Sequence, residues 1–261
     1  MKLTNKKKLF VLIGLLIYFT IYTVTIIDTP FFDDDYLLLS VVRGETKHYL
    51  HNKWNAYNLM SPSIRQTNNS VLPWFTKENY KTSNLRPVTS AFLIIENFIF
   101  GKNYKFYRIV SVLLQFIIAV LIFVIALKVL SRELSAFLAL FIFSLHSFNV
   151  EIVISLFEQC TQLSMLFGLL SFWFYIKFRN KNTYKYFALS VVFLIISVFS
   201  KEIAVIFTLI FFFYDMIYVK NKDVKVKSFI GKNFFIYLLF IIIASVLIIL
   251  YVVNNYGQTH G

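Results

Sequence analysis

Three consecutive carboxylates, Asp33, Asp34 and Asp35, follow an apolar stretch and Pro30. Carboxylates this close together cannot all ionise freely beside a low-dielectric surface, so at least one is expected to have a raised pKa or to bind a cation. Such a group can take a proton from a hydroxyl group. The alternative is a solvated loop cluster that keeps the preceding helix from sliding into the membrane. The residue types alone leave both interpretations open.

Further ionisable residues lie between apolar runs later in the chain. Glu151 and Glu158 flank a short connection, and His146 precedes Glu151 by about one helical turn. An ionisable group at membrane depth costs about 2.5 to 3.5 kcal/mol on insertion scales, which makes these residues candidates for function. For His146 alone, a hydrogen-bonded histidine in the core is the simpler interpretation. Ser200 and Glu202 can both be explained by capping of a helix that begins there.

Three cations have the chemistry needed to hold a phosphate. Lys201 lies at an expected helix start, where a positive charge is unfavourable, so capping does not explain it. Arg86, directly before Pro87, and Arg108 could each grip a phosphate or carboxylate through two parallel hydrogen bonds. Arginines that reach towards lipid head groups from the membrane edge are the alternative.

The composition is that of a chain folded in lipid. Hydrophobic residues make up 58% of the 261 positions and charged residues 15%, which is far from the balance of a water-soluble domain. The net charge of +13 comes from short basic runs between apolar stretches, and no basic helix or stacking platform for nucleic acid is present. A single cysteine, Cys160, rules out an internal disulfide and is expected to be a small packed residue.

Apolar stretches of suitable length predict an all-α membrane protein, a single module over residues 1–261 with about seven transmembrane helices. The predicted spans are residues 9–27, 106–127, 134–150, 163–178, 186–199, 203–219 and 234–253. The fifth and sixth are separated only by Ser200, Lys201 and Glu202, which predicts a tight helical hairpin.

Basic residues predict the orientation. They gather before the first span and in the connections at 128–132, 177–185 and 220–232, all of which fall on one side if there are seven spans. The positive-inside rule makes that side, with the N-terminus, cytoplasmic. The loop at 28–105 is then exoplasmic, and its apolar segment at 88–100, interrupted by polar residues, predicts an amphipathic helix at the membrane interface.

Four segments together resemble the GT-C superfamily of membrane glycosyltransferases. They are FFDDDYLLL (31–39), LRPVTSAFLIIENFIFGKNYKFYRIVSVLLQ (85–115), HSFNVEIV (146–153) and SKEIAVIFTLIFFFYD (200–215). Their order is similar to the protein O-mannosyltransferase-like branch, which includes tetratricopeptide-bearing transmembrane mannosyltransferases. The second segment is the most specific.

The sequence departs from that family at several points. Ser147 stands where the family has proline, Gln115 where histidine is common, and Gln159 near a frequent arginine. The chain reaches Gly261 soon after the seventh span, whereas relatives continue with more spans or a soluble domain. A fragment, a decayed copy and a minimal module therefore all remain open.

The resemblance implies transfer of a mannose-like or other hexose or pentose from a polyprenyl-phosphate donor to a hydroxyl of protein, lipid or glycan. The anomeric centre would be inverted, in a bacterial inner membrane or an endoplasmic-reticulum membrane. One aspartate of the trio, Asp34 above all, would be the base. Arg86, Lys201 and Arg108 would bind the donor phosphate. Glu151, Glu158, His146 and Glu202 would orient the acceptor or, with Asp34, hold Mg²⁺ or Mn²⁺.

Two other functions remain open. A transporter or flippase of lipid-linked or anionic solutes would need polar residues deep in several spans, and Gln115 and Gln162 are the main ones. A non-catalytic, truncated membrane module is the other. No glycine-rich nucleotide motif is present.

Overall fold

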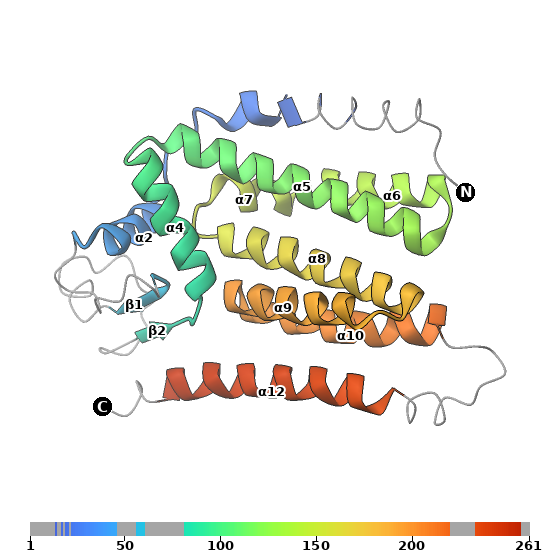
Figure 1. Cartoon of the computed structure of the whole chain (residues 1–261). Coiled ribbons are helices and arrows are strands. Elements are labelled where there is room, and N and C mark those ends of the chain that lie inside the picture. Colours follow the sequence, from blue (N-terminus) through green and yellow to red (C-terminus); the bar gives the residue numbers. More distant parts are fainter. Residues whose placement is uncertain are drawn as a thin grey trace.

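The computed structural model describes residues 14, 17, 19–20, 22–45, 56–60, 81–219 and 233–256. These residues form a bundle of long helices that run side by side, with a smaller layer across one end of the bundle (Figure 1). The N-terminal lysines, part of the first predicted span and the basic connection at 220–232 lie outside the described residues.

The longest described helix, α5 (Tyr104–Leu130), is capped by Asn103 at its start and by Ser131 at its end. The side-chain oxygen of Asn103 accepts a hydrogen bond from the Lys105 amide and so caps the first turn. Ser131 adopts a positive φ of 55°, which ends the helix and turns the chain back on itself. The chain then returns along α6 (Glu133–Leu145).

The predicted third span at 134–150 is not one continuous helix. α6 stops at Leu145, and α7 (Phe148–Ile154) continues after a bend of 59°. The break falls at His146 and Ser147, where α6 ends with extended backbone. Hydropathy alone did not reveal it, because the apolar run continues on both sides.

The helices α8 (Gln159–Lys181) and α9 (Tyr184–Ser200) form an antiparallel hairpin with the most extensive helix contact in the described residues. Asn182 ends α8 with a positive φ of 49°, a conformation that asparagine adopts more readily than most residues. The hairpin places the end of α9 beside the start of α8.

Small hydroxyl side chains allow α8 and α9 to approach closely. Ser171 donates to the backbone carbonyl of Ser190 at 2.6 Å, and Ser197 donates to the carbonyl of Ser164 at 2.5 Å. All four residues are buried. Small residues and interhelical hydrogen bonds take over the role of apolar burial where lipid surrounds a helix pair.

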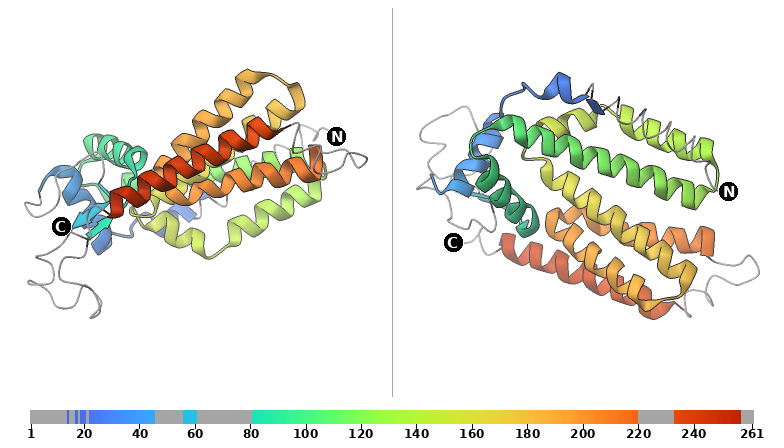
Figure 2. Two further views of the ribbon diagram at one scale, coloured as in Figure 1. Left: turned by 90° about the horizontal axis from the view of Figure 1, so that it is seen from below. Right: turned by 45° about the horizontal axis from the view of Figure 1, so that its top comes forward.

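After α9 the chain breaks at Lys201, whose backbone is extended, and continues in the short 3₁₀ helix η2 (Glu202–Val205). α10 (Ile206–Tyr214) follows and ends in a π-helical turn, η3 (Asp215–Val219). The last described helix, α12 (Phe234–Tyr256), runs back along the bundle (Figure 2).

The layer at the end of the bundle contains α2 (Asp33–Arg43) and α4 (Pro87–Phe100). It also contains an antiparallel pair of short strands, β1 (Asn58–Met60) and β2 (Lys81–Ser83). The expectation of an all-α fold is therefore correct for the bundle but not for this strand pair. α4 packs against α2, α5, α8 and α9, and so lies across the bundle end as an interfacial helix would.

Aromatic rings in contact with one another fill the centre of the bundle. The rings of Tyr175 and Phe211 lie 4.6 Å apart between centroids, and those of Phe211 and Phe240 lie 5.0 Å apart. These contacts join α8, α10 and α12. A separate apolar cluster at the bundle end contains Leu38 of α2 and Leu93 of α4, both fully buried.

Two described helical segments, α5 and the run Glu202–Val219, are long and apolar enough to cross a membrane. The bent pair α6–α7 makes a third candidate if it acts as one span. α4, α9 and Phe234–Val246 of α12 are apolar but shorter. The described residues thus support a membrane protein with two or three candidate spans, and the predicted count of seven is not supported by this criterion.

Large apolar side chains also cover the outside of the bundle. Many are strongly exposed on α6, α10 and α12: Leu134, Leu138, Phe141, Ile142, Leu145, Ile206, Leu209, Phe213, Phe235, Ile241 and Ile249. Apolar residues in such numbers along the sides of a bundle are typical of a surface that faces lipid rather than water.

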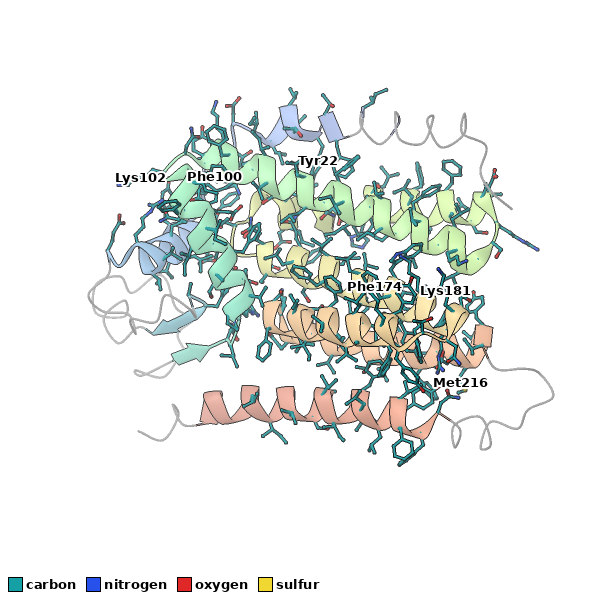
Figure 3. The ribbon with its side chains drawn as sticks, viewed as in Figure 1. Tyr22, Phe100, Lys102, Phe174, Lys181 and Met216 are labelled. Carbon is teal, nitrogen blue, oxygen red and sulfur yellow. The ribbon has the colours of Figure 1, made fainter. Side chains whose placement is uncertain are left out.

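The two ends of the bundle differ. Phe100 and Lys102 lie at the end that carries α4, and Lys181 and Met216 lie at the opposite end (Figure 3). The α5–α6 and α8–α9 connections also lie at that opposite end (Figure 1). Exposed cations of these connections are Lys128, Arg132, Lys181 and Lys185. These two of the connections predicted to share one side of the membrane therefore lie together.

Candidate functional site

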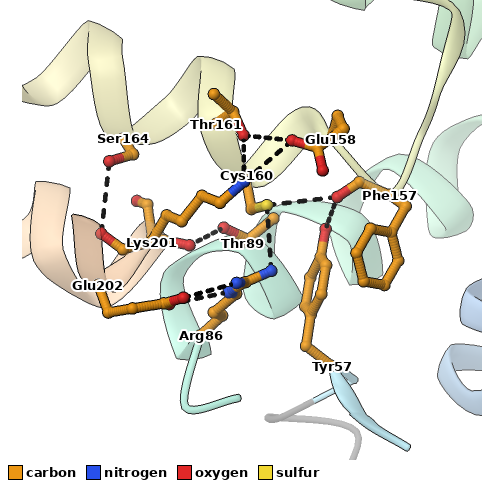
Figure 4. A network of polar contacts seen from close by, with 11 residues as sticks. Tyr57, Arg86, Thr89, Phe157, Glu158, Cys160, Thr161, Ser164, Lys201 and Glu202 are labelled. Atoms are coloured by element: carbon orange, nitrogen blue, oxygen red, sulfur yellow. Dashed lines mark hydrogen bonds and ion pairs between the residues drawn. The ribbon is translucent and has the colours of Figure 1, made fainter. Parts of the chain in front are cut away.

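Charged side chains from distant parts of the sequence meet where α4, the start of α8 and the α9–α10 junction come together (Figure 4). The ammonium of Lys201 donates to Glu158 Oε2 at 3.0 Å and to Thr161 Oγ1 at 2.6 Å. Thr161 also donates to the Glu158 carboxylate. Burial favours the neutral acid, but the hydrogen bonds from Thr161 and Lys201 outweigh it and hold the pKa of Glu158 below its ordinary value.

Arg86 lies next to this group, at the N-terminal end of α4. Pro87 occupies the first turn, where its missing N–H costs nothing. The guanidinium donates two hydrogen bonds to Glu202, from Nε at 3.2 Å and from Nη2 at 2.9 Å, and Nη1 donates to Cys160 Sγ at 3.3 Å. It also lies 5.1 Å from the ring centroid of Tyr57. Burial opposes the charge, but Glu202 outweighs it and raises the pKa of Arg86.

Phe157 connects this cation cluster to the aspartate helix α2. The hydroxyl of Tyr57, which lies under Arg86, donates to the Phe157 carbonyl at 3.1 Å. The Phe157 amide donates to Asp35 Oδ1, also at 3.1 Å. Through one residue of the α7–α8 connection, the aspartate segment and the cation cluster are therefore held at the same end of the bundle.

Asp35 forms a buried ion pair with Arg108 of α5. Both side chains are 0% exposed, and Arg108 Nη2 lies 3.4 Å from Asp35 Oδ2. Arg108 also donates to the carbonyls of Thr29 and Pro30, at 3.2 and 2.8 Å. Burial raises the pKa of Asp35, although backbone hydrogen bonds and Arg108 oppose this effect. The pair fixes the chain at its entry to α2.

Asp34, the preferred base, lies in the first turn of α2 and is exposed. Successive helical residues point about 100° apart, so the burial of Asp35 turns Asp34 outward. The side chain of Asp33 lies outside the described part of the structure.

Glu151 and His146 lie apart from these contacts. Both are exposed, Glu151 on α7 and His146 at the bend before it. His146 Nδ1 accepts a hydrogen bond from the Phe148 amide at 3.3 Å, which stabilises the bend. His146 is thus hydrogen-bonded, as expected for a structural histidine, but it is not in the core.

The acids do not assemble a cation site in the described part of the chain. Among those residues, no group of three or more His, Cys, Asp or Glu side chains could hold a metal ion. The suggestion that Asp34 and Glu151 hold Mg²⁺ or Mn²⁺ therefore stays a prediction, because Mg²⁺ is usually bound by one or two carboxylates together with waters and substrate phosphates.

Several residues at this bundle end were not predicted as site residues from the sequence: Tyr57, Thr89, Gln159, Cys160 and Thr161. Thr89 donates to the carbonyl of Ser200 at 3.0 Å and joins α4 to the α9 end. A partial signal existed, because Gln159 and Thr161 are polar residues in the first turn of a long apolar helix. Their partners on other helices could not be read from spacing.

A second polar network closes the opposite end of the bundle. Buried Asp215 accepts hydrogen bonds from Arg179 Nε at 2.8 Å, Tyr175 at 2.7 Å and Tyr237 at 2.8 Å. Arg179 also donates to Asn233 at 2.8 Å. The network joins α8, η3 and α12, and it pairs the charge of Asp215 with that of Arg179 inside the protein.

The end with α4 therefore combines an exposed carboxylate, two cations paired with glutamates, and a buried ion pair that fixes the loop before α2. This arrangement has groups suited to proton removal and to contact with an anion. Comparison of the chain with protein-family models, with curated proteins and with solved structures finds no match to any of them.

Proposed function

We propose that the chain is a membrane glycosyltransferase of the GT-C type, which moves a sugar from a polyprenyl-phosphate donor to a hydroxyl group on the exoplasmic face. The observation that carries the proposal is the contact through Phe157, whose amide donates to Asp35 and whose carbonyl accepts from Tyr57 beneath Arg86. A base and a phosphate-binding group must act on the same sugar, so their location at one bundle end supports this chemistry.

The proposal includes seven spans. They are the stretch at 9–27, α5, the bent pair α6–α7, α8, α9, the run Glu202–Val219 and α12. The grouping of the basic α5–α6 and α8–α9 connections at the end away from α4 supports a cytoplasmic location for that end. The candidate site then faces the exoplasmic side.

Asp34 is the proposed base. Its carboxylate takes the proton from the acceptor hydroxyl as the acceptor oxygen forms a bond to the anomeric carbon. The bond from that carbon to the phosphate oxygen breaks on the opposite face, and polyprenyl phosphate leaves with the electron pair. The products are the inverted glycoside, the lipid phosphate and protonated Asp34. A positioned base of this kind contributes about 10² to 10⁴ in rate.

Lys201 and Arg86 are the proposed phosphate contacts. The Lys201 ammonium has three N–H groups, of which Glu158 and Thr161 accept two, so a third can donate to a phosphate oxygen. The Glu202 side chain is 36% exposed, so a donor phosphate could exchange with it on Arg86. The glutamates keep the cations ordered before the donor arrives. Glu151 and His146 are left as proposed contacts of the acceptor.

Asp35 and Arg108 act as positioning residues in this mechanism. Their ion pair is fully buried, and it orients α2 so that Asp34 points outward. This assignment differs from the resemblance, which implied a phosphate contact for Arg108.

The test is sugar transfer by the purified protein in nanodiscs, with labelled polyprenyl-phosphate sugars and a panel of hydroxyl acceptors. D34N is expected to abolish transfer, because an amide cannot accept the proton. The matched control is D28N, which removes an exposed carboxylate that pairs with Lys105 at the same bundle end. D28N should retain transfer.

Membrane insertion and thermal unfolding of both variants should match the unmodified chain. Full transfer by a folded D34N protein would remove the proposed base. Movement of label across the bilayer without covalent transfer would instead support a flippase.

A further inference from the structure

Glu96 of α4 lies against Gln159, the first residue of α8, in a fully buried contact. Gln159 Nε2 donates to Glu96 Oε1 at 3.0 Å. Glu96 is 3% exposed and Gln159 is 0% exposed. Among the described residues, the remaining oxygens, Glu96 Oε2 and Gln159 Oε1, have no hydrogen-bond partner. Both side chains therefore present one unpaired acceptor each beside a single hydrogen bond.

Protonation of Glu96 would allow these two unpaired acceptor oxygens to form a hydrogen bond with each other. An ionised carboxylate only accepts hydrogen bonds, whereas a protonated one also has an O–H donor. A proton on Glu96 Oε2 can be donated to Gln159 Oε1, which closes a ring of two hydrogen bonds between acid and amide. The same proton removes a buried charge, whose burial without a partner is costly.

The arginines of α2 and α5, and the one that precedes α4, are engaged by groups other than Glu96. On α2, Arg43 donates to Asn97 at 2.8 Å and to the Gly101 carbonyl. Arg86, at the start of α4, binds Glu202. Other charged or titratable groups on the elements around α4 include Arg108, which pairs with Asp35, and Lys201, which pairs with Glu158. Cys160 accepts a hydrogen bond from Arg86, and the Tyr107 hydroxyl donates to the Gly101 carbonyl. No ion pair to Glu96 occurs among the described residues.

We propose that Glu96 is a positioning residue that carries a proton at neutral pH and is joined to Gln159 by two hydrogen bonds, holding the start of α8 in place. Gln159 lies between Glu158, which binds Lys201, and Cys160, which contacts Arg86. Loss of the proton places a charge against Gln159 and loosens this turn. The consequence for sugar transfer rests on the proposed function, but the acid–amide pair itself does not.

The pKa of Glu96 agrees with this geometry. Burial raises it to about 8, and the hydrogen bond from Gln159 only partly offsets that effect. The carboxyl is therefore expected to be neutral at neutral pH and to ionise as the pH rises through about 8.

The first experiment is infrared difference spectroscopy of the full chain in nanodiscs. The carbonyl stretch of a protonated carboxylic acid should be present at neutral pH, be lost as the pH passes about 8, and be absent from E96Q. A spectrum without that band at neutral pH, or one in which E96Q retains it, would overturn the proposal. The pH titration of the unmodified chain stands even if a variant fails to fold.

The second experiment uses Cys160, the only cysteine in the chain, as a reporter beside Gln159. Its maleimide labelling rate should rise several-fold more in the unmodified chain than in E96Q between neutral pH and pH values above 8. E96Q is the matched control. It has a neutral side chain beside Gln159 at every pH, and its Cys160 thiol ionises with pH as it does in the unmodified chain. Replacement of exposed Glu45 by Gln should leave the rate profile unchanged.

Equal profiles for the unmodified chain and E96Q would show that Glu96 does not control this turn. E96A should label rapidly at every pH, because it lacks both hydrogen bonds. None of these measurements depends on sugar transfer. The proposal for Glu96 and the glycosyltransferase proposal are therefore tested independently, and either one can be overturned without the other.

Discussion

The ring of Phe207 on α10 packs directly over the backbone of Gly168 on α8. A Cβ atom on Gly168 would lie 2.1 Å from Cε2 of Phe207, so even alanine cannot enter without moving the ring. G168A is therefore expected to destabilise the bundle by about 1 to 3 kcal/mol, the usual range for overpacking. Thermal unfolding in detergent would measure this loss.

The double variant G168A/F207L provides the control. A smaller side chain at Phe207 should recover part of the loss, so the two changes should be less than additive. Additive losses of stability would mean that the ring of Phe207 does not oppose the new methyl group at Gly168.

The buried pair of Asp35 and Arg108 predicts that neighbouring aspartates differ in their effect on stability. D35N should cost about 3 to 5 kcal/mol, because it leaves a buried guanidinium without its counter-charge. D34N, at an exposed position, should unfold like the unmodified chain. Equal melting temperatures for the two variants would contradict the burial of Asp35.

Lys201 is expected to bind the donor phosphate. K201M should weaken binding of a polyprenyl phosphate to the chain in nanodiscs, measured by native mass spectrometry. The double variant K201M/E158Q removes the cation and its partner together, so it leaves no unpaired carboxylate. Loss of binding in both variants would identify the cation itself as the cause. Unchanged binding in the double variant would assign Lys201 to helix packing.

The lowered pKa of Glu158 predicts a dependence of stability on acid. A carboxyl whose folded-state pKa lies below its unfolded value of about 4.5 stabilises the fold above that value. The contribution is lost as the pH falls through the folded-state pKa. Melting temperatures should thus decline at acid pH more in the unmodified chain than in E158Q. Parallel curves would show that the Glu158–Lys201 contact adds no stability.

The sequence predicted the helical bundle and the break at Lys201 well. Long apolar runs in lipid satisfy their backbone groups as helices, so the end of α9 and the start of the helical run Glu202–Val219 followed from the charges between them. The division of that run into η2, α10 and η3 was not predicted. The segment at 88–100 likewise corresponds to α4 within one residue at its start. Arg86, Glu158, Lys201 and Glu202 were named individually, and the structure brings these four together.

The partners of those residues could not be predicted. Three aspartates in a row offer no period that distinguishes the buried one from the exposed one, and the burial of Asp35 depends on Arg108 of α5. The salt bridge between Arg86 and Glu202 joins residues 116 positions apart. Contacts of this kind depend on helix packing, which local spacing does not encode.

The short length of α6 has a consequence for the lipid around it. At about 1.5 Å per residue, its 13 residues reach roughly 20 Å, whereas the hydrocarbon core is about 30 Å thick. If α7, which continues after a bend of 59°, does not supply the missing depth, the bilayer beside α6 is expected to thin locally. Head groups would then dip towards α7 on that flank, and a lipid-borne phosphate could approach the polar end of the protein without leaving its leaflet.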